Sequence, residues 1–220
     1  GLEQSFGSIS CVGIGADEKP IAFKWPFGIE QYFNLMKKNI VIVAGEPDAG
    51  KSAYLLNVVK LNMNQYKIHY FSSEMGAAEM KSRMLKFDIP LSSWKFVVKE
   101  RATHFQDVIK PNDINIIDYM EISDNFYLIG GWITAIFNKL QNGVAIIALQ
   151  KPRGRDEGRG GEITKEKARL YLSMSHGTIK IVKAKNWVHP QINPKDLELS
   201  FKLVDGCNFI PQTTWQKPLK

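Results

Sequence analysis

Eight consecutive residues, Gly45-Glu46-Pro47-Asp48-Ala49-Gly50-Lys51-Ser52, carry the clearest chemistry in this sequence. They fit G-x-x-x-x-G-K-S, the pattern of the phosphate-binding P-loop. In such a loop the backbone N–H groups surround a phosphate, and the positive end of the following helix faces it. Lys51 is expected to reach the β- and γ-phosphates of a nucleotide, and the Ser52 hydroxyl to ligate Mg²⁺. The motif therefore predicts a site for ATP and Mg²⁺.

Two further polar side chains end predicted strands. Asp118 closes the apolar stretch 113–118, where an aspartate can hold Mg²⁺ opposite Ser52. Gln150 closes the stretch 144–149, and its amide is expected to sense the γ-phosphate and report it to the segment that follows. Because ligand sites of parallel sheets lie at the carboxyl ends of the strands, both side chains are predicted to face the nucleotide.

Glu74 comes just after the predicted strand 67–72 and is the candidate catalytic base. If this strand lies beside the strand that precedes the P-loop, the Glu74 carboxylate lies near the γ-phosphate and can polarise the attacking water. Glu121, three residues past Asp118, is the competing base. The alternative role of Glu74 is that of a surface carboxylate at the start of the following helix.

The elements that must position these residues alternate along the chain. The predicted strands are 39–44, 67–72, 113–118 and 144–149, and the predicted helices are 52–66, 77–87 and 126–140. This order predicts an α/β fold with a mostly parallel central sheet and helices on both faces. Farther along, we expect a helix over 163–174 and a C-terminal antiparallel β pair, 178–183 with 197–203.

Composition limits the number of domains and the class of protein. The 220 residues, 44% of them hydrophobic, suffice for one core of ordinary size. The predicted parts are a lead-in segment 1–38, a nucleotide-binding domain 39–210 and a flexible basic tail 211–220. Two cysteines, Cys11 and Cys207, exclude a disulfide framework and a cysteine-based metal site. The sequence begins with Gly-Leu rather than Met, which is typical of a fragment that lacks an upstream part.

No apolar run approaches the roughly 18 residues that a membrane helix needs, and the N-terminus lacks the layout of a signal peptide. We therefore expect no membrane partner and a cytoplasmic location. The net charge of +7 and the pI near 9.3 suit a polyanionic partner but do not identify a fold.

A glycine- and arginine-rich segment, 151–161, follows Gln150. Its cations, Lys151, Arg153, Arg155 and Arg159, are expected to follow the phosphate backbone of single-stranded DNA. The segment contains no aromatic residue, so binding by base stacking is not expected. Two acidic residues, Asp156 and Glu157, dilute its charge, and a mobile hydrophilic loop without a ligand is the alternative.

Five motifs together resemble the RecA-like ATPase domain of DnaB-type replicative helicases, over about residues 25–210. They are the P-loop, Phe71-Ser72-Ser73-Glu74-Met75, Ile116-Ile117-Asp118-Tyr119-Met120, Ile146-Ile147-Ala148-Leu149-Gln150 and Ile181-Val182-Lys183-Ala184-Lys185-Asn186. The resemblance implies that Glu74 is the catalytic base, Asp118 the magnesium residue and Gln150 the sensor. It also implies that Lys183 and Lys185 enter the active site of the neighbouring subunit. The family has Arg where this chain has Lys185, and Lys lacks the bidentate fork of Arg, so slower hydrolysis or a need for a partner is expected.

The expected function is ATP hydrolysis by a RecA-like motor domain that acts on single-stranded DNA, as a DNA helicase or helicase-related ATPase of a phage- or plasmid-encoded replication system. A homo-oligomeric ring, such as a hexamer, is the expected assembly. One alternative is a recombinase-like or loader ATPase that binds DNA without unwinding it. Another is a nucleotide-gated assembly or regulatory module that does not bind DNA.

Overall fold

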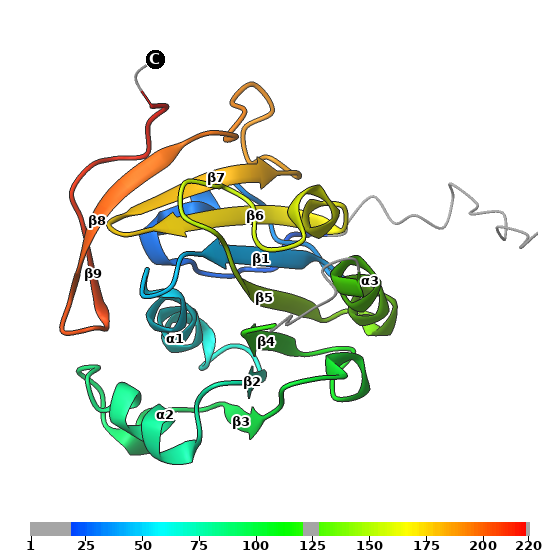
Figure 1. Cartoon of the computed structure of the whole chain (residues 1–220), viewed down its shortest axis with the longest axis vertical. Helices are drawn as coiled ribbons and strands as arrows, with labels where there is room; N and C mark the ends of the chain where they lie inside the picture. The colour runs from blue at the N-terminus through cyan, green and yellow to red at the C-terminus, as the bar shows by residue number, and fades with distance from the viewer. Residues whose placement is uncertain (1–18, 121–127, 219–220) are drawn as a thin grey trace, which may run out of the picture.

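A single nine-stranded sheet organises the protein in a computed structural model that describes residues 19–120 and 128–218. The strand order is β3-β2-β4-β5-β1-β6-β7-β8-β9 (Figure 1). The first six strands of this order run parallel, and the last three continue the sheet in antiparallel pairs. The strands are β1 (Ile40–Gly45), β2 (Ile68–Ser72), β3 (Val97–Glu100), β4 (Ile114–Asp118), β5 (Val144–Gln150), β6 (Ala168–Ser175), β7 (Thr178–Ala184), β8 (Glu198–Val204) and β9 (Asn208–Pro211).

Helices cover both faces of the sheet. Along β1, Val41 and Val43 join the core on the face of α1 (Lys51–Asn62) and α2 (Ala77–Met84). The alternate residues Ile40, Ile42 and Ala44 join the core on the face of α3 (Leu128–Lys139). Burial on both faces explains why the central strands are continuous runs of Val, Ile and Ala rather than alternating patterns. The predicted α/β fold, with a mostly parallel sheet and helices on both faces, is confirmed.

The register of the parallel strands brings their carboxyl ends together at one end of the sheet. Gly45 pairs with Gln150, and Ser72 pairs with Asp118. The premise that β2 lies beside β1 is wrong, because β4 and β5 lie between them. Residues that follow β2 therefore reach the P-loop across two intervening strands.

The predicted helix over 163–174 is wrong. Residues Gly161–Lys165 form the short 3₁₀ helix η4, and Ala168–Ser175 form β6, which pairs in parallel with β1. From Leu170 to Met174 every side chain of β6 is buried, so the strand shows no two-residue alternation that would distinguish it from a buried helix. The predicted antiparallel pair is confirmed as β7 with β8, and β6 and β9 extend it on either side.

The segments at the two ends of the described chain pack on the same core. In the lead-in, residues Pro26–Gln31 form the short 3₁₀ helix η1, and residues 21–25 are not in a strand. At the other end, the Trp215 indole N–H donates to the Phe27 carbonyl at 2.9 Å, and Gln216 bridges to Glu198. Five apolar lead-in side chains are buried: Phe23, Trp25, Ile29, Phe33 and Leu35. The domain boundaries at 38 and 211 stay predictions.

Candidate nucleotide-binding site

The P-loop connects β1 to α1 with the backbone geometry of an anion cradle. Asp48 and Gly50 have positive φ angles of 59° and 92°. Gly50 is the N-cap of α1, and no side chain of the described residues caps this helix end. A helix start leaves its first N–H groups without internal partners, and here they are available to a phosphate together with the positive end of the helix dipole.

Lys51 lies directly over the end of β1. A Cβ added to Gly45 would approach the Lys51 Cγ to 2.5 Å, so only glycine leaves room for the lysine stem. The ammonium donates to the carbonyl oxygens of Gly45 at 3.2 Å and Glu46 at 3.0 Å. Burial lowers the pKa of Lys51, while the nearby charges of Asp118, Glu74 and Asp48 oppose this shift.

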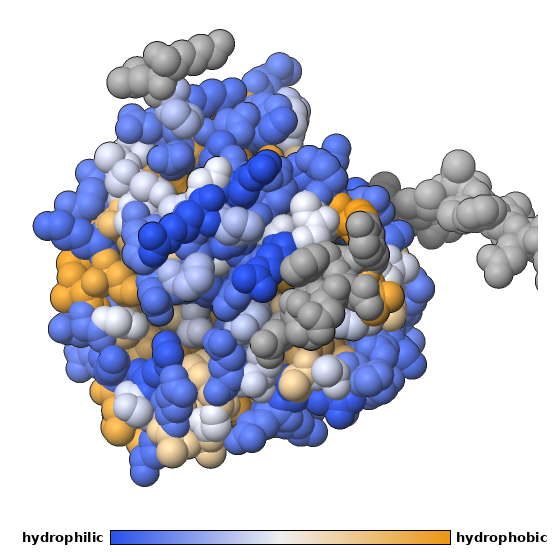
Figure 2. All heavy atoms as spheres, viewed as in Figure 1, coloured by the Kyte–Doolittle hydropathy of each residue, from blue (hydrophilic) through white to orange (hydrophobic). Residues whose placement is uncertain are grey.

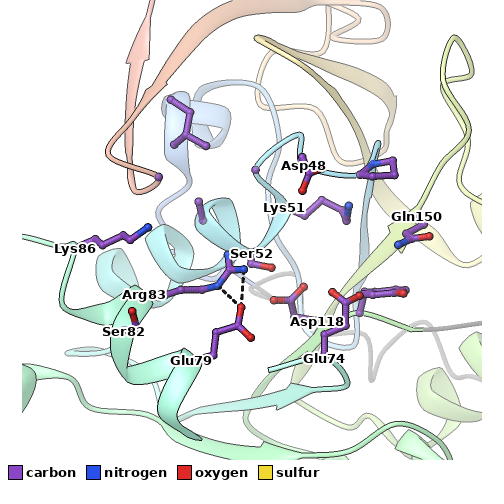
Figure 3. A pocket seen from close by; sticks show the side chains of 16 residues that line it. Asp48, Lys51, Ser52, Glu74, Glu79, Ser82, Arg83, Lys86, Asp118 and Gln150 are labelled. Carbon is purple, nitrogen blue, oxygen red and sulfur yellow. Dashed lines mark hydrogen bonds and ion pairs between the residues drawn. The ribbon is translucent and has the colours of Figure 1, made fainter. Parts of the chain in front are cut away.

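Side chains from separate strand ends surround one cavity of about 510 Å³ above the P-loop (Figure 3). Lys51 and Ser52 line it from α1, Glu74 from the turn after β2, Asp118 from β4 and Gln150 from β5. The structure thus brings together the residues that the sequence predicts around ATP. Their chemical roles stay predictions.

Asp118 is the most enclosed acid of this cavity, with 3% of its surface exposed. The Tyr70 hydroxyl donates to its carboxylate at 2.5 Å. Burial raises the pKa of Asp118 above its usual value, although hydrogen bonds from Tyr70 and Ser52 and the charges of Lys51 and Arg83 act in the opposite direction. Ser52 is near enough to influence the pKa of Asp118, and both line the cavity, so the two predicted magnesium ligands are neighbours.

This pair of ligands fits Mg²⁺ better than a metal held by protein alone. The described residues contain no group of three or more His, Cys, Asp or Glu side chains that could hold a metal ion. Mg²⁺ is commonly bound through one or two protein oxygens, with water and nucleotide phosphates as its other ligands. Asp118 and Ser52 supply such a set beside the phosphate cradle.

The turn after β2 holds Glu74 at the mouth of the cavity. The Ser72 hydroxyl accepts the Met75 N–H at 2.9 Å, and the Ser73 N–H donates to the Asp118 carbonyl at 3.0 Å. These bonds tie the turn to the end of β4, which brings the Glu74 carboxylate near that of Asp118 (Figure 3). The competing base, Glu121, lies outside the described residues.

Cationic side chains of α2 and the turn after it also line the cavity, and the sequence analysis missed them. Arg83 and Lys86 reach it from this side, and Arg83 pairs with Glu79 at 2.8 Å. The Glu-Arg spacing of four residues is typical of a solvent-exposed helical ion pair, so it gave no signal of a binding site. Leu203 of β8 and Gly206 of the turn between β8 and β9 line the same cavity.

The structure argues against the predicted contact of Lys151 with DNA, because this side chain is buried. Its ammonium donates to Ser173, Ser175 and the Arg155 carbonyl at 2.8–2.9 Å. A phosphate backbone outside the protein cannot reach a cation enclosed in this way. No sequence pattern indicated this burial, because a lysine after a strand is usually exposed.

The three arginines of segment 151–161, Arg153, Arg155 and Arg159, are exposed. The two acidic residues pair with lysines from other elements, Asp156 with Lys180 at 2.7 Å and Glu157 with Lys165 at 2.9 Å. Strongly hydrophilic side chains gather on the face where the segment between β5 and β6 runs (Figure 2). The internal pairing of the acidic residues leaves the arginines as the exposed charges of the segment.

Lys183 and Lys185 lie away from the P-loop cavity of their own chain. Gly45 pairs with Met174, and Met174 pairs with Ile179 of β7. Lys183 is four residues beyond Ile179 on β7. This places it about 13 Å from Ile179, toward the amino ends of the parallel strands and away from the P-loop. Both lysines line a separate cavity of about 600 Å³, together with Trp187. They therefore do not line the nucleotide cavity of their own chain, and their role in a neighbouring copy stays a prediction.

Comparison with known proteins adds a family and a fold. Residues 30–124, which include β1 to β4, match the model of the DnaB-like helicase C terminal domain family. The structure is similar to the KaiC-like protein PH0186 of the hyperthermophilic archaeon Pyrococcus horikoshii OT3, with a TM-score of 0.69 and 14% identity over 90% of this chain and 100% of that one. No curated protein matches the sequence. Within the described residues, no helix has the length and apolar character to cross a membrane.

Proposed function

We propose that the chain hydrolyses ATP and acts as a motor on single-stranded DNA, because residues 30–124 match the model of the DnaB-like helicase C terminal domain. The observation that carries this proposal is the convergence of Lys51, Glu74, Asp118 and Gln150 on one cavity at the P-loop. A helicase or helicase-related ATPase of a replication system is the role that this arrangement supports best.

Each side chain of the cavity has a distinct task in the proposed reaction. Lys51 and the N–H groups at the start of α1 hold the β- and γ-phosphates. Ser52 and Asp118 hold Mg²⁺, which when bound neutralises charge on the phosphates. Glu74 orients the attacking water and accepts its proton. Gln150 contacts the γ-phosphate and reports its loss to segment 151–161.

The site needs a second copy of the chain for completion. Lys183 and Lys185 lie near the opposite edge of the sheet, so in a ring they would reach the nucleotide of the next subunit. Burial and then the positive charges of Lys185, Arg169 and Lys165 lower the pKa of Lys183, so a phosphate of the neighbouring subunit would relieve this repulsion and favour the charged lysine. Because Lys185 stands where the related helicases have Arg, we expect slower hydrolysis than an arginine finger gives.

A specific observation favours a second candidate, a nucleotide-gated module that never contacts DNA. Lys151 is engaged inside the protein, which leaves three arginines in the segment proposed to bind DNA. A recombinase-like or loader ATPase would keep DNA binding but show no unwinding.

The decisive experiment measures ATP turnover of the assembled oligomer with and without single-stranded DNA at low salt. We expect Glu74→Gln to retain ATP binding and to lose turnover by about 10²-fold or more. Glu100→Gln, the same change at an exposed carboxylate on β3, is the matched control and should turn over ATP normally. Unchanged turnover in Glu74→Gln would remove Glu74 as the base. Absence of stimulation by DNA would favour the regulatory module.

A further inference from the structure

A buried charge pair joins the P-loop to the segment after β5. Glu46, the second residue of the P-loop, has 9% of its side chain exposed, and Lys151 has 3%. The Lys151 Nζ lies 4.0 Å from the nearer Glu46 carboxylate oxygen. Neither side chain is part of the lining of the nucleotide cavity. Because charges are rarely buried without a structural or functional reason, this pair calls for an explanation.

Lys151 holds one side of the turn that carries the exposed arginines. Its ammonium donates to the Arg155 carbonyl at 2.8 Å, and the Arg155 N–H donates to the Pro152 carbonyl at 3.4 Å, which closes the turn. We call residues 152–155 the arginine turn. The two remaining donors of Lys151 go to Ser173 and Ser175 at the end of β6. All three N–H groups of the ammonium are thereby used.

Glu46 lies on the other side of the arginine turn, near the Gly154 backbone. Its carboxylate accepts the Ser175 hydroxyl at 3.1 Å and the His176 ring N–H at 3.3 Å. Burial alone would raise the pKa of Glu46, but these hydrogen bonds and the charge of Lys151 hold the pKa below its usual value. The carboxylate is therefore charged at neutral pH. Ser175 contacts both charged groups and completes the network.

The P-loop end of this network lies at the phosphate-binding lysine. Lys51 donates to the Glu46 carbonyl at 3.0 Å, and the Lys151 N–H donates to the Gly45 carbonyl at 3.0 Å. A phosphate that binds Lys51 competes with these carbonyl oxygens for the ammonium. Hydrogen bonds therefore run from Lys51 to the Glu46 carbonyl, and from the Glu46 carboxylate through Ser175 to Lys151. Lys151 then contacts the arginine turn at the Arg155 carbonyl.

We propose that Glu46 and Lys151 are positioning residues that couple nucleotide binding at the P-loop to the conformation of the arginine turn. The inference rests on the proposed binding of ATP at the P-loop and of DNA at the arginine turn. Since coupling between two sites is reciprocal, DNA bound to Arg153 and Arg155 would change the affinity for ATP by the same factor.

Amide hydrogen exchange of residues 152–158, measured by mass spectrometry with and without a nonhydrolysable ATP analogue and Mg²⁺, tests the coupling. In the unmodified chain we expect the analogue to change the exchange rate at least about fivefold. Glu46→Gln and Lys151→Met should each reduce this nucleotide effect to near unity. The double variant should match the single variants, because the two residues act as one unit.

Two further variants separate coupling from simple loosening of the segment. Lys180→Met removes the ion pair with Asp156, so it should speed exchange in the segment but keep the nucleotide effect. Ser175→Ala keeps both buried charges and should reduce the effect in part. It provides the test if a charge variant fails to fold.

The possible results distinguish failure of the coupling from failure of the proposed function. A nucleotide effect that persists in Glu46→Gln and Lys151→Met would overturn the inference, and so would bound analogue without any effect in the unmodified chain. Oligonucleotide binding is measured in parallel by fluorescence anisotropy. If no oligonucleotide binds while the nucleotide effect depends on Glu46 and Lys151, the coupling stands and the proposed action on DNA fails. A chain that binds no ATP analogue would overturn both.

Discussion

Two buried tyrosines allow a stability test in which the same chemical change has opposite effects. Tyr70 on β2 and Tyr54 on α1 are both 0% exposed. The Tyr70 hydroxyl donates to the Asp118 carboxylate at 2.5 Å, whereas the Tyr54 hydroxyl has no hydrogen-bond partner among the described residues. Replacing either tyrosine with phenylalanine removes one oxygen and leaves the packed ring. The difference between the variants therefore isolates the hydrogen bond.

The expected magnitudes follow from the state of each hydroxyl. A hydrogen bond to a charged group contributes about 1.5–3 kcal/mol, so Tyr70→Phe should lower the free energy of unfolding by this amount. For a domain of this size that is a decrease in Tm of roughly 3–12 °C. A buried hydroxyl without a partner costs about 1–3 kcal/mol, so Tyr54→Phe should raise the free energy of unfolding by up to that amount.

Urea unfolding followed by tryptophan fluorescence measures both variants against the unmodified chain. The midpoints should move in opposite directions with an unchanged m-value, which would locate the effect in stability rather than in the extent of unfolding. Equal destabilisation of the two variants would refute the reasoning, because it would show that the Asp118 hydrogen bond adds nothing beyond the packing of the ring.

Three other predictions concern the pH dependence of stability, the room for a side chain at Gly143 and the salt dependence of DNA binding. Because burial holds the pKa of Asp118 above its usual 3.8, the folded chain binds this proton more tightly than the unfolded chain, and stability falls as pH rises through the raised pKa. Asp118→Asn should remove that fall in a series of Tm measurements against pH, and parallel curves would contradict it. Gly143→Ala should cost about 3 kcal/mol or more, because its Cβ would approach the Asp113 carbonyl oxygen to 2.4 Å. Gly131→Ala in α3 is the control: no described atom lies within 4 Å of the added Cβ, so a gain of up to about 1 kcal/mol is expected. Replacing Arg153, Arg155 and Arg159 with Ala should reduce the salt-dependence slope of single-stranded DNA binding by about 2, whereas Lys202→Ala on β8 should leave the slope unchanged.

The sequence predicted the positions of the site residues well where a local pattern determines them. The P-loop is a contiguous motif, and Asp118 and Gln150 each end an apolar run, so their positions follow from strand ends alone. Glu74 was placed correctly near the cavity from an incorrect premise, since β2 is not the neighbour of β1. Strand order depends on long-range pairing, which no local pattern shows.

The residues that the sequence misplaced share a different cause. β6 is buried on both faces, so it lacks the alternation that identifies a strand. Lys151 is buried because Ser173, Ser175 and the Arg155 carbonyl converge on it, and these groups are separated from it along the chain by up to 24 residues. Such convergence can be seen only once the sheet has assembled.

The burial of apolar side chains between residues 23 and 35 means that folding requires more of the chain than the proposed chemistry does. Each fully buried large apolar side chain contributes about 1.5–3 kcal/mol, and Phe23, Trp25, Ile29, Phe33 and Leu35 are five of them. Their summed contribution, about 8–15 kcal/mol, is comparable to the whole net stability of an ordinary domain. A fragment that begins at β1 would keep every proposed catalytic group. We would still expect it to aggregate or remain unfolded, because it lacks these five buried side chains.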